Sequence, residues 1–481
     1  MFETITPQLL ELNFCKNPLC ADFGSLNLAN YSILNDRQYS QIACASCHTI
    51  SPTLWPDELD KELTSQAQYR HADLSACGNK KCDNFANHVQ LYPHSYYSFG
   101  FSGEKQRYRC KQCKKTFVDQ FSIANPHLKI HVTILALLLT GFSLREITSK
   151  LKIQAKTLND HINTMASICR HKSSIFDHHW QNQSQKFSLV SNCCALQPNS
   201  NNGVLWVCTS DSNSHYITHQ SFNIAKNYTL ADRRIINKEY LASINTPCTM
   251  PIDEKLPSLL NALISDHKNR SDRSNPLHNQ TQLNYPLKSG LVTPIYCATA
   301  HFNQLNQWLE NKQHLIISMN FEPMLAQAAM TSFNRMRQKQ CLDLLYQVDD
   351  LNWMEGKGGG KPQPLLLKET PAPWSISEQW HLKTDSDQRA ICQLVESTLT
   401  QQQAHQLPKL TPLTDYMTRF HAMFKTIVNE PRRRRRPEGL LPLLDIYKAW
   451  NNLCHQETPG ETPAVKAKIS EKPLSLDQLL Q

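Results

Sequence analysis

The 481-residue sequence contains no apolar run long enough to cross a bilayer. Its longest such run, Ile134–Leu139, falls far short of the roughly 20 residues that a spanning helix needs. The first residues also lack the basic segment and following apolar stretch of a secretory leader. We therefore expect a cytoplasmic protein with no membrane partner.

Charged side chains are scarce as well, at 19% of the sequence against about 25% in an average globular protein. A hydrophobic share of 40% supports folded cores and excludes a disordered composition. The length predicts about three domains. The net charge of +9 is compatible with a nucleic-acid partner but does not demand one.

A phosphate-binding loop is also missing. The glycine-rich segment Gly356–Pro362 does not have the G-x4-G-K-[ST] form that wraps a phosphate, and no strand-to-helix context surrounds it. We expect a plain loop there, and nothing in the sequence indicates an organic cofactor.

Cysteine, by contrast, is abundant, with 17 residues. In a reducing compartment such a number indicates metal ligands or buried thiols rather than disulfides. Eight of the cysteines form two copies of one pattern, a C-x4-C pair followed by a C-x2-C pair. The two copies consist of Cys15, Cys20, Cys44 and Cys47, and of Cys77, Cys82, Cys110 and Cys113.

Two short-spaced cysteine pairs on separate turns can supply the four ligands of a tetrahedral zinc ion. We therefore predict two zinc ribbons, at residues 1–60 and 70–125, each with one structural Zn²⁺ site. The alternative is two sets of buried free cysteines, which the repeated spacing disfavours.

The second predicted ribbon is the basic one. A face built by these residues could contact phosphates, whereas the alternative is a solvated charged hairpin. Its basic residues are Lys105, Arg107, Arg109, Lys111, Lys114 and Lys115, with Tyr108 and Phe117 close by.

A helical segment follows at residues 126–172. We predict a first helix at 127–140 that Gly141 ends, and a short second helix with a capping box of Ser143 and Glu146. After a tight turn, a third helix runs from about Gln154 to Arg170. This is the pattern of a helix-turn-helix, and an ordinary helical bundle is the alternative. The third helix would read DNA through Gln154, Lys156, Thr157, Asn159 and Asp160.

Residues 171–186 look like a linker to an α/β region at 187–455. We expect strands at 187–191, 203–210, 215–222 and 314–319, helices at 299–309, 323–340, 386–405, 413–428 and 441–454, and an insertion at about 245–290. Five consecutive arginines, among them Arg433 and Arg434, are consistent with a phosphate contact, and a solvated loop is the alternative. Residues 456–481 are expected to form a flexible tail.

The string Arg107–Phe117 and the helices after it resemble the N-terminal half of bacterial insertion-sequence transposases. The later region is similar in layout to their RNase H-like DDE domain, with Ala300-His-Phe and Arg419-Phe as weaker motifs. The resemblance implies a multidomain α+β fold: two zinc ribbons, a three-helix helix-turn-helix and an RNase H-like domain. It also implies that the partner is double-stranded DNA and that the protein lies on the nucleoid when it binds DNA. A homo-oligomer is possible in that family.

In that family three carboxylates hold two divalent metal ions for strand transfer. At the corresponding places this sequence has Asn192, Asn320 and Thr418. We therefore expect a transposase-like DNA-binding protein without strand-transfer activity. Two alternatives stay open: an active Mg²⁺-dependent transposase, and a zinc-stabilised protein scaffold. The fallback acids for an active site are Asp211, Glu322 and Asp415.

Overall fold

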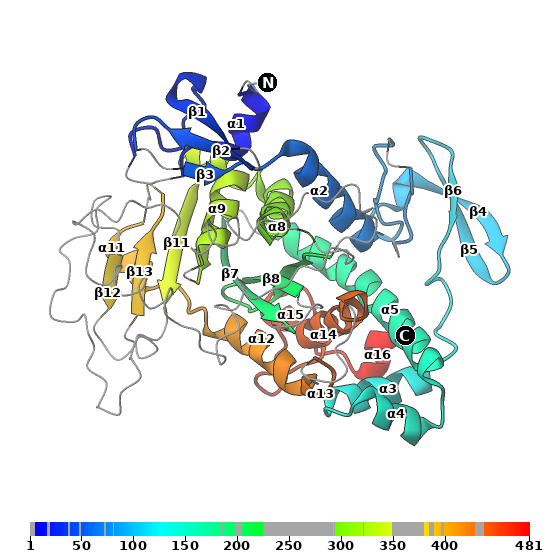
Figure 1. The fold of residues 1–481 in the computed structure, drawn as a ribbon. Coiled ribbons are helices and arrows are strands. Elements are labelled where there is room, and N and C mark those ends of the chain that lie inside the picture. Colours follow the sequence, from blue (N-terminus) through cyan, green and yellow to red (C-terminus); the bar gives the residue numbers. More distant parts are fainter. Residues whose placement is uncertain are drawn as a thin grey trace, which may run out of the picture. The chain divides into compact units, whose positions relative to one another are not determined.

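The computed structural model divides the chain into two compact units (Figure 1). Unit 1 comprises Met1–Leu63 and Ser184–Met417, and unit 2 comprises Thr64–Gln183 and Thr418–Gln481. The predicted insertion, the glycine-rich loop and Arg433 with Arg434 lie outside the described residues. The structure describes residues 5–16, 20–36, 39–47, 50–71, 74–79, 81–183, 186–197, 204–224, 292, 294–320, 322–348, 380–383, 389–395, 399–428 and 437–481.

Unit 1 contains a seven-stranded mixed sheet with the strand order β12-β13-β11-β10-β7-β8-β9. β7, β10 and β11 are parallel to one another, whereas the remaining neighbours pair antiparallel. The strands are β7 Lys186–Leu196, β8 Val204–Asp211, β9 Ile217–Phe222, β10 His314–Met319, β11 Leu342–Val348, β12 Trp380–Lys383 and β13 Arg389–Gln393.

Helices cover both faces of this sheet. Successive strand residues point to opposite faces, so Ser191 and Asn192 mark the two sides. Ser191 bonds Thr209, which contacts His301 of α8, whereas Asn192 contacts Thr414 of α12. Figure 1 accordingly shows α8 and α9 on one side of β7 and α12 on the other. The helices of this region are α8 Pro294–Leu309, α9 Pro323–Ser332, α10 Asn334–Gln338, α11 Gln401–His405 and α12 Thr411–Met423.

Several elements of this sheet differ from the sequence-based prediction. β7 continues five residues past the predicted end, to Leu196, because β8 pairs with it along its length. The predicted helix at 386–405 is wrong in its first part: β13 is a strand there, between β11 and β12. The predicted helix at 323–340 is two helices that meet at Phe333, and β11 was not predicted.

The first cysteine-rich segment also belongs to unit 1. It has a three-stranded antiparallel sheet of order β1-β2-β3. A small core of Leu10, Phe14, Tyr31 and Ile42 packs beside its cysteines. The elements are α1 Pro7–Asn13, η1 Leu28–Asn30, β1 Tyr31–Asp36, β2 Tyr39–Cys44 and β3 Ile50–Pro52, followed by α2 Pro56–His71, which contains the boundary between the units.

Unit 2 combines a second three-stranded sheet, of order β4-β5-β6, with a helical region. α14 packs along the long helix α5, and Arg170 of α5 donates to the Asp445 carboxylate of α14 at 2.6 Å. No helix in the described part of the chain is long and apolar enough to cross a bilayer. The elements are η2 Pro93–Ser95, β4 Tyr96–Ser102, β5 Lys105–Cys110, β6 Thr116–Val118, α3 Leu128–Leu139, α4 Leu144–Leu151, α5 Ala155–Gln181, α13 Lys425–Val428, η6 Pro437–Gly439, α14 Leu441–Leu453, α15 Pro463–Lys466 and α16 Leu476–Leu480.

Two predictions in unit 2 are wrong. The expected linker at 171–186 is mostly helix, because α5 runs on to Gln181 and buries His171 and Trp180. The expected flexible tail instead forms α15 and α16, and Leu479 and Leu480 are fully buried.

Candidate metal centres and nucleic-acid interface

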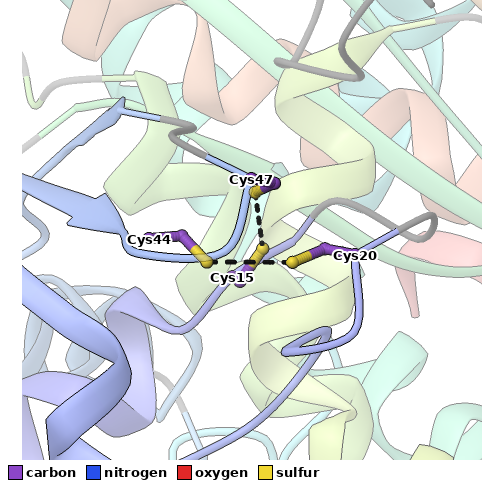
Figure 2. A group of neighbouring side chains, drawn as sticks. All are labelled: Cys15, Cys20, Cys44 and Cys47. Atoms are coloured by element: carbon purple, nitrogen blue, oxygen red, sulfur yellow. Dashed lines mark hydrogen bonds between the residues drawn. The ribbon is translucent and has the colours of Figure 1, made fainter.

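The four cysteines of the first segment converge on one point (Figure 2). Cys15 and Cys47 have sulfur atoms 3.6 Å apart, and those of Cys20 and Cys44 are 3.8 Å apart. Sulfurs bound to one tetrahedral zinc at about 2.3 Å would be about 3.8 Å apart, so the donor set fits that ion. A disulfide would bring two sulfurs to about 2.05 Å.

The second cluster repeats this geometry. The Sγ atoms of Cys77 and Cys113 are 3.4 Å apart, and those of Cys82 and Cys110 are 3.7 Å apart. In both clusters the first cysteine lies beside the fourth, and the second beside the third. The Lys115 backbone N–H lowers the pKa of Cys113 to about 6, whereas burial raises the pKa of Cys82 and raises that of Cys77 to about 12. The converging sulfur atoms, and not the acidity of the thiols, therefore indicate the metal site. All eight predicted cysteines therefore form two sets, each of which could hold a zinc ion.

A tyrosine supports each cluster, and the sequence-based prediction missed both. Tyr31 pairs with Cys44 across the sheet, and its hydroxyl accepts the Cys15 N–H at 3.0 Å. Tyr96 pairs with Cys110 in the same way, and its hydroxyl accepts the Cys77 N–H at 3.2 Å. The signal was a tyrosine 13 or 14 residues before the third cysteine of each copy.

The first cluster is fixed to the α/β part of unit 1. The Arg337 guanidinium lies 4.7 Å from the centre of the Phe23 ring, and the Tyr296 hydroxyl accepts the Trp55 N–H at 2.9 Å. A cation–π contact and a hydrogen bond of this kind each contribute about 1 kcal/mol. These contacts indicate a bracing role for the first segment.

The second cluster carries a basic hairpin with exposed aromatic rings. Arg107 and Arg109 lie over the Phe99 ring, at 5.7 and 5.3 Å from its centre. Lys111 is exposed and lies 4.9 Å from the centre of the Tyr97 ring. Lys105 donates to Gln120 at 2.6 Å. The sequence-based prediction named these four basic residues but not the rings.

The short helix α4 begins and ends as its sequence predicts. Ser143 and Glu146 form a reciprocal capping box, in which the Glu146 carboxylate accepts the Ser143 N–H at 2.8 Å. Lys152 ends the helix in the left-handed conformation, with φ of 52°. Only residues 152–154 separate α4 from α5. This tight connection sets the two helices against each other.

One side of the first turns of α5 is apolar and the other is polar. Leu158 and Ile162 are buried at 1% and 0% exposure. The polar residues that the sequence named for DNA contact are all exposed, and they are Gln154, Lys156, Thr157, Asn159 and Asp160. The polar row can therefore reach a partner while the apolar row holds the helix in place.

Of the positions expected to carry catalytic acids, Asn192 and Asn320 lie at the neighbouring strands β7 and β10, which pair in parallel. The Asn192 side chain is buried and its Nδ2 donates to the Thr414 hydroxyl at 3.2 Å. Asn320 follows β10, and its N–H donates to the Ser191 carbonyl at 3.4 Å. Thr414 lies one turn before the expected Thr418 on α12. The sheet thus brings Asn192 and Asn320 to one edge, whereas Thr418 is exposed on α12 and does not join them.

The three fallback acids have other roles or surroundings. Asp211 accepts from the Ser214 N–H at 2.7 Å and caps the β8–β9 turn. Glu322 is the N-cap of α9, and burial raises its pKa to about 8. Asp415 is exposed on α12. Within the described residues, the groups of three or more metal ligands within 4.8 Å of one another are the two cysteine clusters, so these acids do not form such a group.

Comparison of the chain with protein-family models, with curated proteins and with solved structures finds no match.

Proposed function

We propose that this chain is a transposase-like DNA-binding protein with two structural zinc ions and no strand-transfer activity. The observation that carries the proposal is the exposed polar row on α5, placed after a short capped helix and a three-residue turn. A helix of this kind fits the major groove and presents amide, hydroxyl and amine groups to base edges.

The sheet of unit 1 supports the proposal that the chain is transposase-like but lacks strand-transfer activity. Its central order β9-β8-β7-β10-β11, with β7, β10 and β11 parallel, suits an RNase H-like domain. The family's acids would then fall near Asn192, Asn320 and α12. Magnesium needs oxygen ligands, usually with carboxylates among them, and amide and hydroxyl groups bring no negative charge. Two-metal strand transfer is accordingly not expected.

Duplex binding by the full chain tests the proposal. We expect affinity for a labelled duplex to fall with salt, and Lys156→Ala to reduce the slope of log K against log salt by about one. Asn159→Ala should instead reduce the difference in affinity between a preferred DNA sequence and a random one. Lys472→Ala is the matched control, because Lys472 is also an exposed lysine of unit 2. If the chain had no duplex affinity at low salt, the protein-scaffold alternative would replace this proposal.

A further inference from the structure

The outer face of the β4–β5 hairpin in unit 2 carries exposed aromatic rings among basic side chains. Tyr97, Phe99 and Phe101 are 52%, 45% and 66% exposed. These are high values for aromatic side chains, which bury about 150–250 Å² each when they pack in a core. We use "aromatic face" for Tyr97 and Phe99 together with Arg107, Arg109, Lys111 and Lys114.

The register explains why these rings point outward. Tyr96 is 5% exposed and belongs to the core around the cysteines. Tyr97 and Phe99 alternate with it and with Ser98, so they face away from that core. Tyr97 stands opposite Arg109. Between Ser98 and Phe101 the register shifts at Gly100, whose φ of +76° permits a bulge.

The charge of this hairpin identifies the kind of partner. Residues 96–118 contain six lysines and arginines, and their only acid is Glu104. Arg107 and Arg109 extend over Phe99, whereas Lys111 and Lys114 extend over Tyr97, at 4.9 and 5.9 Å from its centre. Each ring is therefore bordered by cations. Aromatic platforms within a positive groove are the arrangement that binds unpaired nucleic-acid strands.

We propose that the aromatic face binds single-stranded nucleic acid, with bases stacked on Tyr97 and Phe99 and phosphates held by the surrounding lysines and arginines. Side chains two residues apart on a strand are about 6.6 Å apart. Bases along one strand of a duplex are only about 3.4 Å apart. Neighbouring rings therefore match bases that have separated from one another, and bases inside a duplex are not accessible to them.

This inference rests on the proposed DNA-binding function, because it assigns a partner to the basic ribbon that was predicted to contact DNA. The two claims involve different elements, however. The duplex is assigned to α5, and the unpaired strand to β4 and β5. Separate measurements with the two kinds of strand can therefore fail independently.

The test measures fluorescence anisotropy of a labelled oligothymidylate, and of a labelled duplex, titrated with the full chain at low salt. Tyr97→Ala and Phe99→Ala should each weaken oligothymidylate binding by about fivefold or more, the lower end of what one stacked base contributes. Both should leave duplex affinity unchanged. Phe99→Trp should preserve binding because it keeps a stacking surface, whereas Phe99→Leu should behave as Phe99→Ala.

Two controls separate stacking from other effects. Leu28→Ala removes an exposed apolar side chain, 40% accessible, from the first cysteine-rich segment and should change nothing. Zinc content should be equal in all variants, which shows that the second cluster is still folded. A labelled oligouridylate distinguishes RNA from DNA as the source of the strand.

Four results would overturn the inference. One is the absence of oligothymidylate and oligouridylate binding at low salt. Another is wild-type binding by Phe99→Leu, which would show that a ring is unnecessary. The third is an equal loss of single-strand and duplex affinity in Phe99→Ala. The last is a change of oligomeric state in that variant with unchanged oligonucleotide binding, which would assign the rings to a protein contact. Duplex binding alone with no single-strand binding would leave the proposed function intact.

Discussion

At the scale of single residues, the two cysteine clusters share more than their ligands. In each, a tyrosine hydroxyl accepts the N–H of the first cysteine. The residue nine positions after that cysteine, Gly24 or Ala86, donates to its carbonyl oxygen with φ of 67° or 60°. The duplication that the cysteine spacing indicated therefore extends to the hydrogen bonds that shape the first turn.

The tyrosine hydroxyls should contribute measurably to metal retention. Tyr96→Phe leaves the buried Cys77 N–H without its acceptor, which costs about 1–3 kcal/mol. We expect the wild type to hold about two zinc ions per chain, one for each set of four ligands. Tyr31→Phe and Tyr96→Phe should each release one of the two ions faster to a chromogenic chelator. Tyr108→Phe is the control, because the Tyr108 ring stacks on Phe117 and the substitution keeps that ring. Equal rates of zinc release from the three variants would show that the hydroxyls of Tyr31 and Tyr96 do not retain the metal.

His131 should make the helical region sensitive to acid. Its Nδ1 accepts from Asn125 at 2.8 Å and its Nε2 lies 3.0 Å from Nδ1 of His161. Burial, with the charges of His161 and His127, lowers the pKa of His131 to about 4. The unfolded chain, whose histidine pKa is about 6.5, therefore binds a proton at His131 more readily than the folded protein does. The free energy of unfolding is greatest above about pH 6.5 and decreases as the pH falls toward about 4.

Thermal unfolding between about pH 7.5 and about pH 5.5 tests whether stability decreases on acidification as expected. The midpoint of the wild type should fall more steeply on acidification than that of His131→Gln, which cannot titrate there. Zinc content at each pH controls for metal loss from the cysteines. Parallel slopes for the two proteins would show that His131 does not contribute.

Features that depend on residues close together in the sequence could be predicted. The cysteine spacing predicted both clusters, and Ser143 with Glu146 predicted the start of α4, because ligands and caps act over a few residues. Tyr31 and Tyr96 recur at nearly the same place in both copies, but their hydrogen bonds to the first cysteine depend on strand pairing across the hairpin and could not be predicted. The contact of Asn192 with Thr414 joins residues more than 200 positions apart, which no local pattern reveals.

At the scale of elements, α5 and the C-terminal helices show where local reading fails. Residues 171–181 are rich in histidine and serine, which suggested a linker. The segment 155–183 has neither glycine nor proline, however, and this was the unused signal for a longer helix. Tertiary contacts sustain it: His171 stacks on Phe121 with ring centres 4.0 Å apart, and the Lys448 amine lies 2.8 Å from the Asp177 carboxylate.

The C-terminal helix should stabilise unit 2. Leu479 and Leu480 are fully buried, and the Leu480 carbonyl accepts from Asn125 at 2.8 Å. Leu479→Ala and Leu480→Ala should each lower the free energy of unfolding by about 2–5 kcal/mol, seen as a lower melting temperature. Glu471→Ala, an exposed position in the same segment, should have little effect. If residues 456–481 were a flexible tail, all three variants would have the melting temperature of the wild type.

At the scale of the whole molecule, the mixed α/β character was predictable, because the β7–β9 meander is local. The outer strands were not, since β11 and β13 are defined by partners distant in the sequence. Each unit contributes separately to the proposed function. Unit 2 contains the surfaces proposed to bind DNA, and unit 1 contains the α/β sheet in which we propose that Asn192 and Asn320 replace catalytic acids.

One gel assay tests both DNA binding and the proposed lack of strand transfer. A labelled duplex is incubated with the full chain and Mg²⁺ or Mn²⁺, and bound and cleaved DNA are read from the same sample under native and denaturing conditions. We predict a shifted complex that contains intact DNA, in the wild type and in Asp211→Ala alike. Metal-dependent cleavage by the wild type that Asp211→Ala abolishes would instead show an active transposase.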